Sequence, residues 1–360
     1  TGTLSFLETP SPAQLRAHSA TVRRNSPYRD RLLDAPPVPA GHVLLAGKIR
    51  HVVYIIKENR TYDQVLGDMK EGNGEPSLVM FGEQVTPNHH KLAREFGLFD
   101  NFYVNADVSA DGHNWSMAAI APDFVQKVWP SGYGGRGARH LYRWGQEIAA
   151  MPPNGYIWSL AHAAGHKIRS FGYLGVNKPL SEVGPDGVHL RDVLDPVLKP
   201  NTNFRYRDYG LEYPDISRAK VFLEDLAEHE KRGEWANFIL IRLGNDHTEG
   251  ARAGRPTPEA HVADNDWALG MIVEGISKSR FWPQTAIFVL EDDAQNGPDH
   301  VDAHRSPAFV LSPYTRRPGA VDSTFYNTTS MLRTMEILLG LRPMTVFDAS
   351  SRPMTSAFIS

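Results

Sequence analysis

The chain has 360 residues, of which 41% are hydrophobic and 22% are charged, enough apolar material for a large folded core. Its formal net charge of −3 gives no general attraction to nucleic acid or to an anionic membrane surface. The chain contains no cysteine, which excludes disulfides, thiolate zinc sites and cysteine nucleophiles. No stretch approaches the length of a transmembrane segment, and the N-terminus lacks the basic-then-apolar pattern of a signal peptide.

Two regions differ in composition. Residues 1–46 are rich in proline, and we predict an N-terminal linker arm that lies over the rest of the protein. Residues 47–360 are predicted to form one α/β domain, because strand-like apolar runs alternate with helical segments. That alternation predicts a doubly wound, mostly parallel sheet with helices on both faces. Between about 122 and 214 the pattern breaks down into Gly, Pro, Trp and Tyr, which suggests an irregular insertion able to act as a lid. We expect helices at residues 88–96, 157–164, 218–231, 258–279 and 328–341.

The first buried strand is expected at Val52–Ile56, where β-branched and aromatic residues follow one another. Glu58 and Asn59 come where this strand leaves the sheet. Ligands of open α/β folds bind just outside the carboxyl ends of the strands. Two neighbouring oxygen donors at such a point suit a hard divalent cation.

A second polar cluster follows a strand-like segment at 98–104. It contains Ser109, Asp111, His113 and Asn114, and a helix is expected to begin near residue 116. A hydroxyl close to a helix N-terminus suits phosphoryl chemistry, because the free N–H groups and the helix dipole favour an anion there. The simpler interpretation is that Ser109 or Asp111 caps the helix.

Two further strands, at 237–244 and 285–291, also end in polar residues. Carboxylates packed closely together repel one another unless a cation or a proton lies between them. The side chains of interest after these strands are Asp246, His247, Asp292, Asp293, His300 and His304.

Two of these segments resemble a known family. Residues 58–63 (Glu-Asn-Arg-Thr-Tyr-Asp) resemble the Glu-Asn-Arg-Ser/Thr-Phe/Tyr-Asp opening motif of the bacterial phosphoesterase family. That family groups phospholipases C with acid phosphatases of the respiratory-burst-inhibiting type, inside the alkaline phosphatase superfamily. Residues 292–301 are similar to the family's Asp-Glu-x-Gly-Gly-x-x-Asp-His-Val motif, and the resemblance covers roughly 47–345. The segment 109–115 looks most like the branch found as a C-terminal module behind a β-propeller. The resemblance implies a secreted or periplasmic protein with a possible N-terminal propeller.

The resemblance also implies a metal site. Glu58, Asn59 and Asp292 match the family's metal-binding residues, and Asp293 stands where the family usually has Glu. A second metal site at Asp246, His247 and His304 is a further possibility. We therefore expect one or two divalent ions per chain. Oxygen ligands suit Ca, Mg or Mn, whereas imidazole ligands would favour Zn.

The nucleophile has two candidates. The family has Thr or Ser three residues before an Asn at the helix start. Counting back from Asn114 gives Asp111, and Ser109 lies two residues further upstream. A serine alkoxide beside a metal is the superfamily's chemistry, so we favour Ser109, with Asp111 as a ligand or orienting group. We expect His113, His247 or His300 to protonate the leaving group. The residues expected to contact the substrate phosphate are Asn114, Arg136 and Arg139.

The resulting hypothesis is metal-dependent hydrolysis of a phosphate ester through a phosphoseryl intermediate. The substrate would be a small molecule or a lipid head group. One alternative is hydrolysis of a sulfate or phosphonate ester on the same scaffold, although the chain has no Cys for the formylglycine of a typical sulfatase. Another alternative is a non-catalytic, metal-stabilised binding module.

Overall fold

A five-stranded sheet forms the centre of the protein, in a computed structural model that describes residues 7–25, 38–135, 147–294, 297–315 and 317–359. The strand order is β4-β7-β1-β8-β9. The first four strands are parallel, and β9 runs antiparallel to β8. The five strands are β1 (His51–Lys57), β4 (Ile168–Phe171), β7 (Phe238–Arg242), β8 (Thr285–Glu291) and β9 (Ala308–Leu311). The predicted mostly parallel sheet is therefore confirmed.

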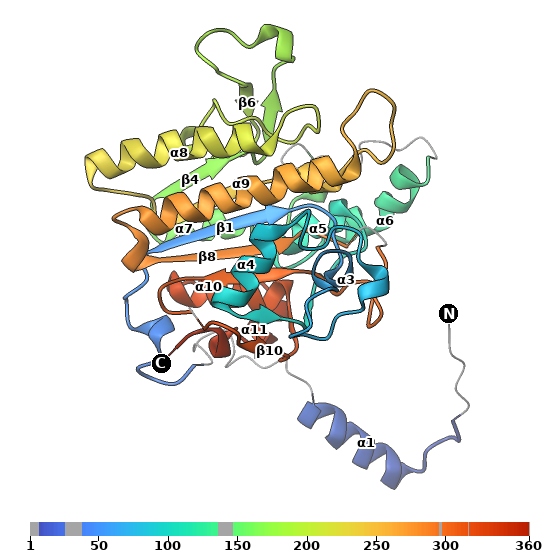
Figure 1. Cartoon of the computed structure of the whole chain (residues 1–360). Helices are drawn as coiled ribbons and strands as arrows, with labels where there is room; N and C mark the ends of the chain where they lie inside the picture. Colours follow the sequence, from blue (N-terminus) through green and yellow to red (C-terminus); the bar gives the residue numbers. More distant parts are fainter. Residues whose placement is uncertain (1–6, 26–37, 136–146, 295–296, 316, 360) are drawn as a thin grey trace.

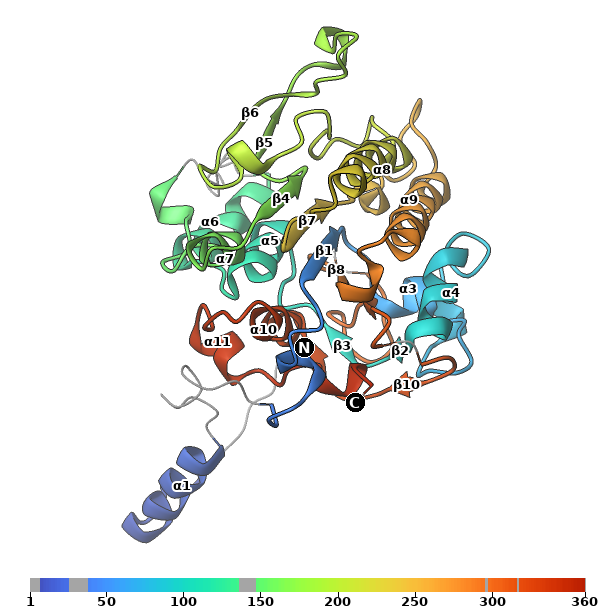
Figure 2. The same ribbon diagram turned by 90° about the vertical axis from the view of Figure 1, so that its left-hand side faces the viewer.

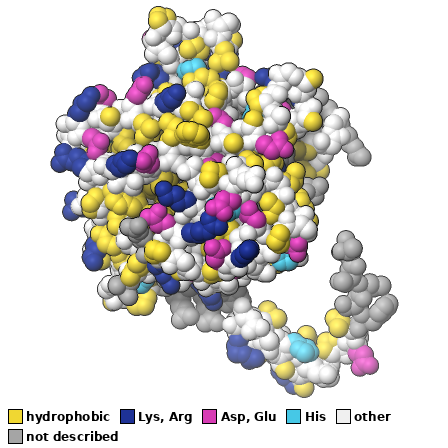
Figure 3. Space-filling model, in the orientation of Figure 1, with side chains coloured by type: hydrophobic (Ala, Val, Ile, Leu, Met, Phe, Trp, Pro, Cys, Tyr) yellow, Lys and Arg dark blue, Asp and Glu magenta, His cyan; other side chains and the backbone are white. Residues whose placement is uncertain are grey.

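Helices cover both faces of this sheet, as predicted for a doubly wound fold (Figure 1). Figure 2 looks along the sheet and shows the two helical layers on either side of it. One layer consists of α4 (Pro87–Phe96), α8 (Asp215–Arg232) and α9 (Pro258–Lys278). The other consists of α5 (Ser109–Ala118), α7 (Ile157–Ala163) and α10 (Thr328–Leu338). On the face formed by α4, α8 and α9, acidic and basic side chains are interspersed with apolar ones (Figure 3).

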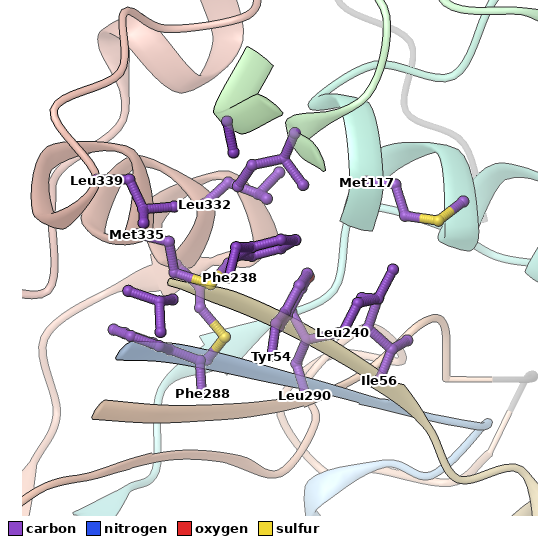
Figure 4. Close-up of a cluster of buried hydrophobic side chains, with 14 of the residues drawn as sticks. Tyr54, Ile56, Met117, Phe238, Leu240, Phe288, Leu290, Leu332, Met335 and Leu339 are labelled. Atoms are coloured by element: carbon purple, nitrogen blue, oxygen red, sulfur yellow. The ribbon is translucent and has the colours of Figure 1, made fainter. Parts of the chain in front are cut away.

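The central strand β1 contributes side chains to two separate hydrophobic cores, because successive side chains of a strand point to opposite faces. Val53 and Ile55 pack toward α4, α8 and α9. Val52, Tyr54 and Ile56 pack toward α5, α7 and α10, with Met117, Leu332 and Met335 around them (Figure 4). All seven residues of β1 are buried. Coverage on both faces explains why this strand reads as a continuous apolar run and not as an alternating one.

The segment 98–104 is not the single strand that its sequence predicts. It forms two short strands, β2 (Leu98–Phe99) and β3 (Phe102–Tyr103), outside the main sheet. The two strands pair with β10 (Val321–Asp322) and β11 (Tyr326–Asn327) respectively. The break falls at Asp100 and Asn101, and the Asp100 carboxylate accepts a hydrogen bond from Asn73 N at 2.9 Å.

The proposed insertion is only partly irregular. Within 122–214, α7 and the edge strand β4 belong to the main α/β layers. The elements outside those layers are α6 (Asp123–Tyr133) and the antiparallel pair β5 (Gly175–Asn177) and β6 (Leu190–Val193). Two short helices, α3 (Tyr62–Leu66) and α11 (Val346–Ser350), complete the described part of the domain.

The N-terminal arm differs from the expected draped linker. It contains a helix, α1 (Pro12–Asn25), that buries none of its residues and stands away from the domain in both views (Figures 1 and 2). Val43 and Leu44, in contrast, pack into the core against α10. Among the described helices, none combines the length and the apolar character needed to span a membrane.

Candidate functional site

The carboxyl ends of three neighbouring strands meet at one edge of the sheet. Ile56 of β1 lies opposite Arg242 of β7, and Lys57 lies opposite Glu291 of β8. The chain therefore leaves these strands side by side, in the place where open α/β sheets bind ligands. The polar residues that come together there are Glu58, Asn59, Asn245, Asp246, Asp292 and Asp293.

Asn59 turns the chain at the end of β1. Its φ is 67°, in the left-handed region that Asn tolerates better than most residues. The turn sends the side chains of Glu58 and Asn59 to different partners. Asn59 Nδ2 donates to Asp293 Oδ2 at 2.8 Å and to Ser109 Oγ at 3.2 Å. One side of the turn therefore faces the proposed nucleophile.

Ser109 is the first residue of α5, which begins seven residues earlier than the sequence suggested. Its hydroxyl donates to Asp293 Oδ2 at 2.8 Å. The N-cap residue is Val108, and no side chain caps this helix, so neither Ser109 nor Asp111 serves as an N-cap. The helix starts early because Val108 is extended and its carbonyl accepts from the backbone N–H groups of Asp111 and Gly112. The Ser109 hydroxyl thus lies at a helix N-terminus, where a negatively charged group is favoured.

Gly112 lets α5 approach the end of β8 closely. A Cβ built on this residue would lie 2.5 Å from the carbonyl oxygen of Asp292 and 2.7 Å from its carbonyl carbon. Both atoms belong to the backbone, so they cannot swing aside as a side chain would. This contact fixes the helix that carries Ser109 against the segment that carries Asp292 and Asp293.

Helix α6 covers the start of α5. The Tyr133 hydroxyl accepts a hydrogen bond from Ala110 N at 3.2 Å. The Tyr133 ring lies edge-to-face with Trp129, with ring centroids 6.0 Å apart. Asp111 is buried beside Trp129, and among the described residues one of its oxygens has no hydrogen-bond partner. Burial raises the pKa of Asp111 to about 6, although Trp129 acts in the opposite direction.

Glu58 faces away from Ser109 and toward a buried arginine. Its Oε1 accepts from Arg242 Nε at 2.8 Å and also contacts Arg242 Nη2. Burial alone would raise the pKa of Glu58, but the Arg242 charge and His113 outweigh it and lower this pKa to about 2. Arg242 also reaches Asp208 at 3.3 Å, and its guanidinium lies over the Tyr209 ring, 4.7 Å from the centroid. Glu58 is therefore ionised and already has a cation beside it.

His113 completes this charged half of the site. Its Nε2 lies 3.0 Å from Arg242 Nη2, 3.2 Å from Glu58 Oε1 and 3.4 Å from Asp292 Oδ2. Burial and the Arg242 charge lower its pKa, so the imidazole is neutral near pH 7. A neutral, fully buried ring beside a permanent cation is poorly suited to donate a proton to a leaving group. His113 is better suited to hold Arg242 and Glu58 in place.

The oxygen donors at this edge fit a divalent cation. Both oxygens of Asp292 and the Oδ1 atom of Asn59 are buried, and within the described residues they have no hydrogen-bond partner. Burial and the neighbouring charge of Asp293 raise the pKa of Asp292 well above its usual range. Ligand atoms of Glu58, His113 and Asp292 lie within 4.8 Å of one another. Unsatisfied buried carboxylates are costly without a counter-ion, so Asp292, together with Asp293 and Asn59, offers oxygen ligands for a cation at this edge.

Lys57 was not singled out from the sequence. It is buried, and its Nζ lies 2.6 Å from Glu291 Oε1 and 2.8 Å from Asp246 Oδ2. Arg60 borders the same group and donates to the backbone carbonyl of Asp246 at 2.7 Å. Lys57 and Arg242 share one sequence signal: each is a charged residue at the end of an otherwise apolar buried strand.

His300 belongs to a separate cluster. Its Nδ1 lies 2.6 Å from Asp63 Oδ2, and Asp63 also accepts from Arg305 at 3.0 Å. Arg305 in turn holds Asp299 at 3.0 Å. This network joins the two segments that carry the resemblance, residues 58–63 and 292–301. The partners of His300 are Asp63, Asn73 and Arg305, not the groups around Ser109, so the structure gives it a holding role and not the predicted proton donor's place.

The remaining predicted residues occupy several environments. His247 follows β7 with its Nδ1 at 2.8 Å from the carbonyl oxygen of Thr248, which leaves Nε2 for other partners. Asn114 donates to Ala110 O at 2.8 Å within α5. His304 contacts Asp107 and Asp302 at 2.9 and 2.8 Å, so the structure does not bring it to Asp246 as a joint metal site. Arg136 and Arg139 lie outside the described residues.

Comparison with known proteins bears on the fold. No protein-family model matches the chain, and no curated protein matches its sequence. Among solved structures, it is similar to a protein in the alkaline phosphatase superfamily from Vibrio parahaemolyticus, with 16% identity, a TM-score of 0.55, and 85% of this chain and 70% of that chain covered. It is also similar to the lipoteichoic acid synthase LtaP from Listeria monocytogenes (14% identity, TM-score 0.56, 90% and 82% covered). A third similar structure is BT1596, a 2-O GAG sulfatase (14% identity, TM-score 0.50, 81% and 71% covered). The chain therefore has the α/β fold of the alkaline phosphatase superfamily.

Proposed function

We propose that this protein hydrolyses phosphate esters, with Ser109 as the nucleophile and a divalent cation held by Asn59, Asp292 and Asp293. The observation that carries the proposal is the pairing of the Ser109 hydroxyl with Asp293 at 2.8 Å, next to the two buried Asp292 oxygens, which lack a hydrogen-bond partner in the described part of the chain. Bound there, the cation would stabilise negative charge on the ester oxygens and favour the serine alkoxide. Glu58 supports this group from the Arg242 side.

The residues of the chain account for the proton movements. As Ser109 Oγ forms a bond to phosphorus, its proton passes to Asp293, which already accepts it as a hydrogen bond. The ester P–O bond breaks, and the leaving alkoxide takes a proton. Of the three candidate histidines we assign this donation to His247, because His113 is neutral and enclosed and His300 is held by Asp63. Water then attacks the phosphoserine and gives a proton to His247, while the bond between phosphorus and Ser109 Oγ breaks. The serine oxygen takes its proton back from Asp293, and phosphate is released.

Phosphate is favoured over sulfate on the charge of the site. Lys57 lies beside Asp246 and Glu291, and Arg242 lies beside Glu58, so we place the external cation at Asp292 and Asp293 instead. A cation there suits a phosphate monoester, which carries two negative charges near neutral pH, more than a sulfate ester, which carries one. Similarity to a sulfatase fold keeps sulfate hydrolysis as the second candidate. Secretion and an N-terminal propeller partner stay predictions from the resemblance.

The test is hydrolysis of para-nitrophenyl phosphate, its bis ester, its phosphorylcholine ester and para-nitrophenyl sulfate by protein loaded with Mg²⁺, Mn²⁺, Ca²⁺ or Zn²⁺. We expect turnover of at least one phosphate ester that EDTA abolishes, and the preferred ester would identify the substrate class. Ser109→Ala should lower kcat by about 10³-fold or more, since it removes the attacking atom.

Ser116→Ala is the matched control, because Ser116 is another serine of α5 but its hydroxyl donates to the backbone carbonyl oxygen of Gly112, one turn earlier in the helix. It should retain activity. Intact-mass analysis of acid-quenched wild type should show one added phosphoryl group that is missing from Ser109→Ala. Turnover of the sulfate ester alone would replace the phosphate proposal, and no turnover with any metal would favour the binding module.

A further inference from the structure

Lys57 lies between two carboxylates at a place where a metal-binding protein could hold a second ion. Its ammonium contacts Glu291 at 2.6 Å and Asp246 at 2.8 Å, and all three residues are nearly fully buried. The two carboxylates come from different elements, the end of β8 and the segment after β7. An ammonium with two carboxylate contacts from the ends of the two strands that flank β1 occupies the position of a bridging cation.

The same group connects to the proposed catalytic residues. Asp246 Oδ1 accepts the backbone N–H of Glu58 at 3.1 Å, while the Lys57 backbone carbonyl accepts the N–H of Asp292 at 3.0 Å. Asn265 of α9 donates to Asp246 Oδ1 at 3.2 Å and fixes it from the helical layer. Lys57 is therefore linked to Glu58 through Asp246 and to Asp292 through its own backbone, and these two residues begin the proposed metal-binding segments.

The charged side chains at this edge of the sheet form separate groups. Lys57 faces Asp246 and Glu291, and Arg242 faces Glu58 and Asp208. Asp293 accepts from two neutral donors, the amide of Asn59 and the hydroxyl of Ser109. Within the described part of the chain, the Asp292 oxygens have no hydrogen-bond partner. The buried Asp292 oxygens are therefore the place where we put the external cation.

We propose that the Lys57 ammonium is a permanent internal cation that takes the place of a second metal ion at Asp246 and Glu291, so that the protein binds one divalent ion. Only the placement of that one ion at Asp292 rests on the proposed function. Lys57 is a positioning residue: through Asp246 it holds the backbone of Glu58, and it keeps the second carboxylate pair from taking a metal.

The test compares wild type, Lys57→Met and Lys57→Met/Glu291→Gln. Lys57→Met removes the ammonium and keeps a long side chain, leaving two carboxylates without their cation. The double variant also removes one of those carboxylates, so the group regains the net charge that it has in wild type at nearly constant shape. Each protein is dialysed against buffer with saturating Mn²⁺, and bound manganese is measured by elemental analysis. Thermal unfolding is followed with EDTA and with Mn²⁺.

We expect one Mn²⁺ per wild-type chain, two per Lys57→Met chain and one in the double variant. In EDTA, Lys57→Met should unfold at a lower temperature than wild type. Mn²⁺ should restore much of the lost unfolding temperature in Lys57→Met, and the double variant should recover it without metal. Two ions in the wild type, one ion with unchanged stability in Lys57→Met, or equal instability of both variants would overturn the proposal.

The outcomes separate this inference from the proposed function. If the wild type binds no Mn²⁺ and hydrolyses nothing, the proposed function fails. Recovery of the Lys57→Met stability loss by Glu291→Gln in EDTA would still establish Lys57 as the internal cation. If the wild type is active with one bound ion and the double variant recovers nothing, the internal-cation role fails while the proposed function stands.

Discussion

Replacing Arg242 with Met would leave Glu58 buried without its cation. Burial, opposed by the stronger effects of Arg242 and His113, places the pKa of Glu58 at about 2 against an ordinary value of 4.5. A difference of this size corresponds to about 3 kcal/mol. Loss of one partner from a buried pair typically costs about 3–5 kcal/mol. Asp208 adds little to that cost, because backbone N–H groups of Gly175 and Tyr209 bond to it at 2.7 and 2.6 Å. We therefore expect Arg242→Met to lower the free energy of unfolding by about 3 kcal/mol at pH 7.

The pH dependence gives this prediction its sign. A carboxylate whose pKa is lowered by folding contributes stability above its ordinary pKa, and that contribution is lost as the pH falls through the folded value. In Arg242→Met, Glu58 keeps His113 but loses the charge that lowers its pKa most, and burial then favours its protonated form. The difference between wild type and variant should therefore be largest at pH 7 and narrow as the pH falls toward 4.

Urea unfolding in EDTA at several pH values measures this difference without any contribution from bound metal. Arg242→Met/Glu58→Gln is the control, since it removes the stranded charge and should recover most of the lost stability. A loss below about 1 kcal/mol at pH 7, or a loss that does not change between pH 7 and pH 4, would refute the reasoning, because either means that the pair is not a desolvated charge pair.

Two further predictions concern α5. Gly112→Ala should destabilise the protein by about 1–3 kcal/mol and slow turnover, because the new methyl group meets the Asp292 backbone. Helix propensity alone would make this substitution stabilising, so a gain in stability would contradict the close contact. Gly184→Ala, where the nearest atom is the end of a flexible Asp side chain, is the control for both measurements. Burial raises the pKa of Asp111 to about 6, so the stability of the wild type should fall as the pH rises from about 4 through 6. Asp111→Asn should abolish this dependence of stability on pH. In EDTA, the melting temperature of the variant should change less with pH than that of wild type across this range. Parallel curves of melting temperature against pH would contradict the prediction.

The strands were the most predictable part of the fold. The run 285–291 forms β8 with the bounds expected, and β1 extends the expected strand by one residue at each end. Strands buried on both faces have uniformly apolar sequences, and a charged residue marks where they leave the sheet. The segment 98–104 was not predictable in this way, because its short strands depend on pairing with residues more than 200 positions away.

The candidate site was predictable as a set of residues but not as a set of contacts. Local patterns placed Glu58, Asn59, Asp292 and Asp293 at strand ends, and parallel strands bring such ends together. The sequence could not show that Lys57 would be shared by residues of two other strands. Histidines were the hardest to assign, because their role depends on which side chain faces each ring nitrogen. That partner comes from a distant segment for His300 and from the next residue for His247.

The left-handed turn at Asn59 restricts which residues evolution or design can place there. The backbone conformation admits Gly, Asn and Asp far more readily than any branched residue. Glycine would remove the amide that donates to Asp293 and Ser109. Aspartate would exchange that donor for a further negative charge against Asp293. Asparagine alone satisfies the conformation, the hydrogen bonds and the charge together, so substitutions at this position should be among the least tolerated in the chain.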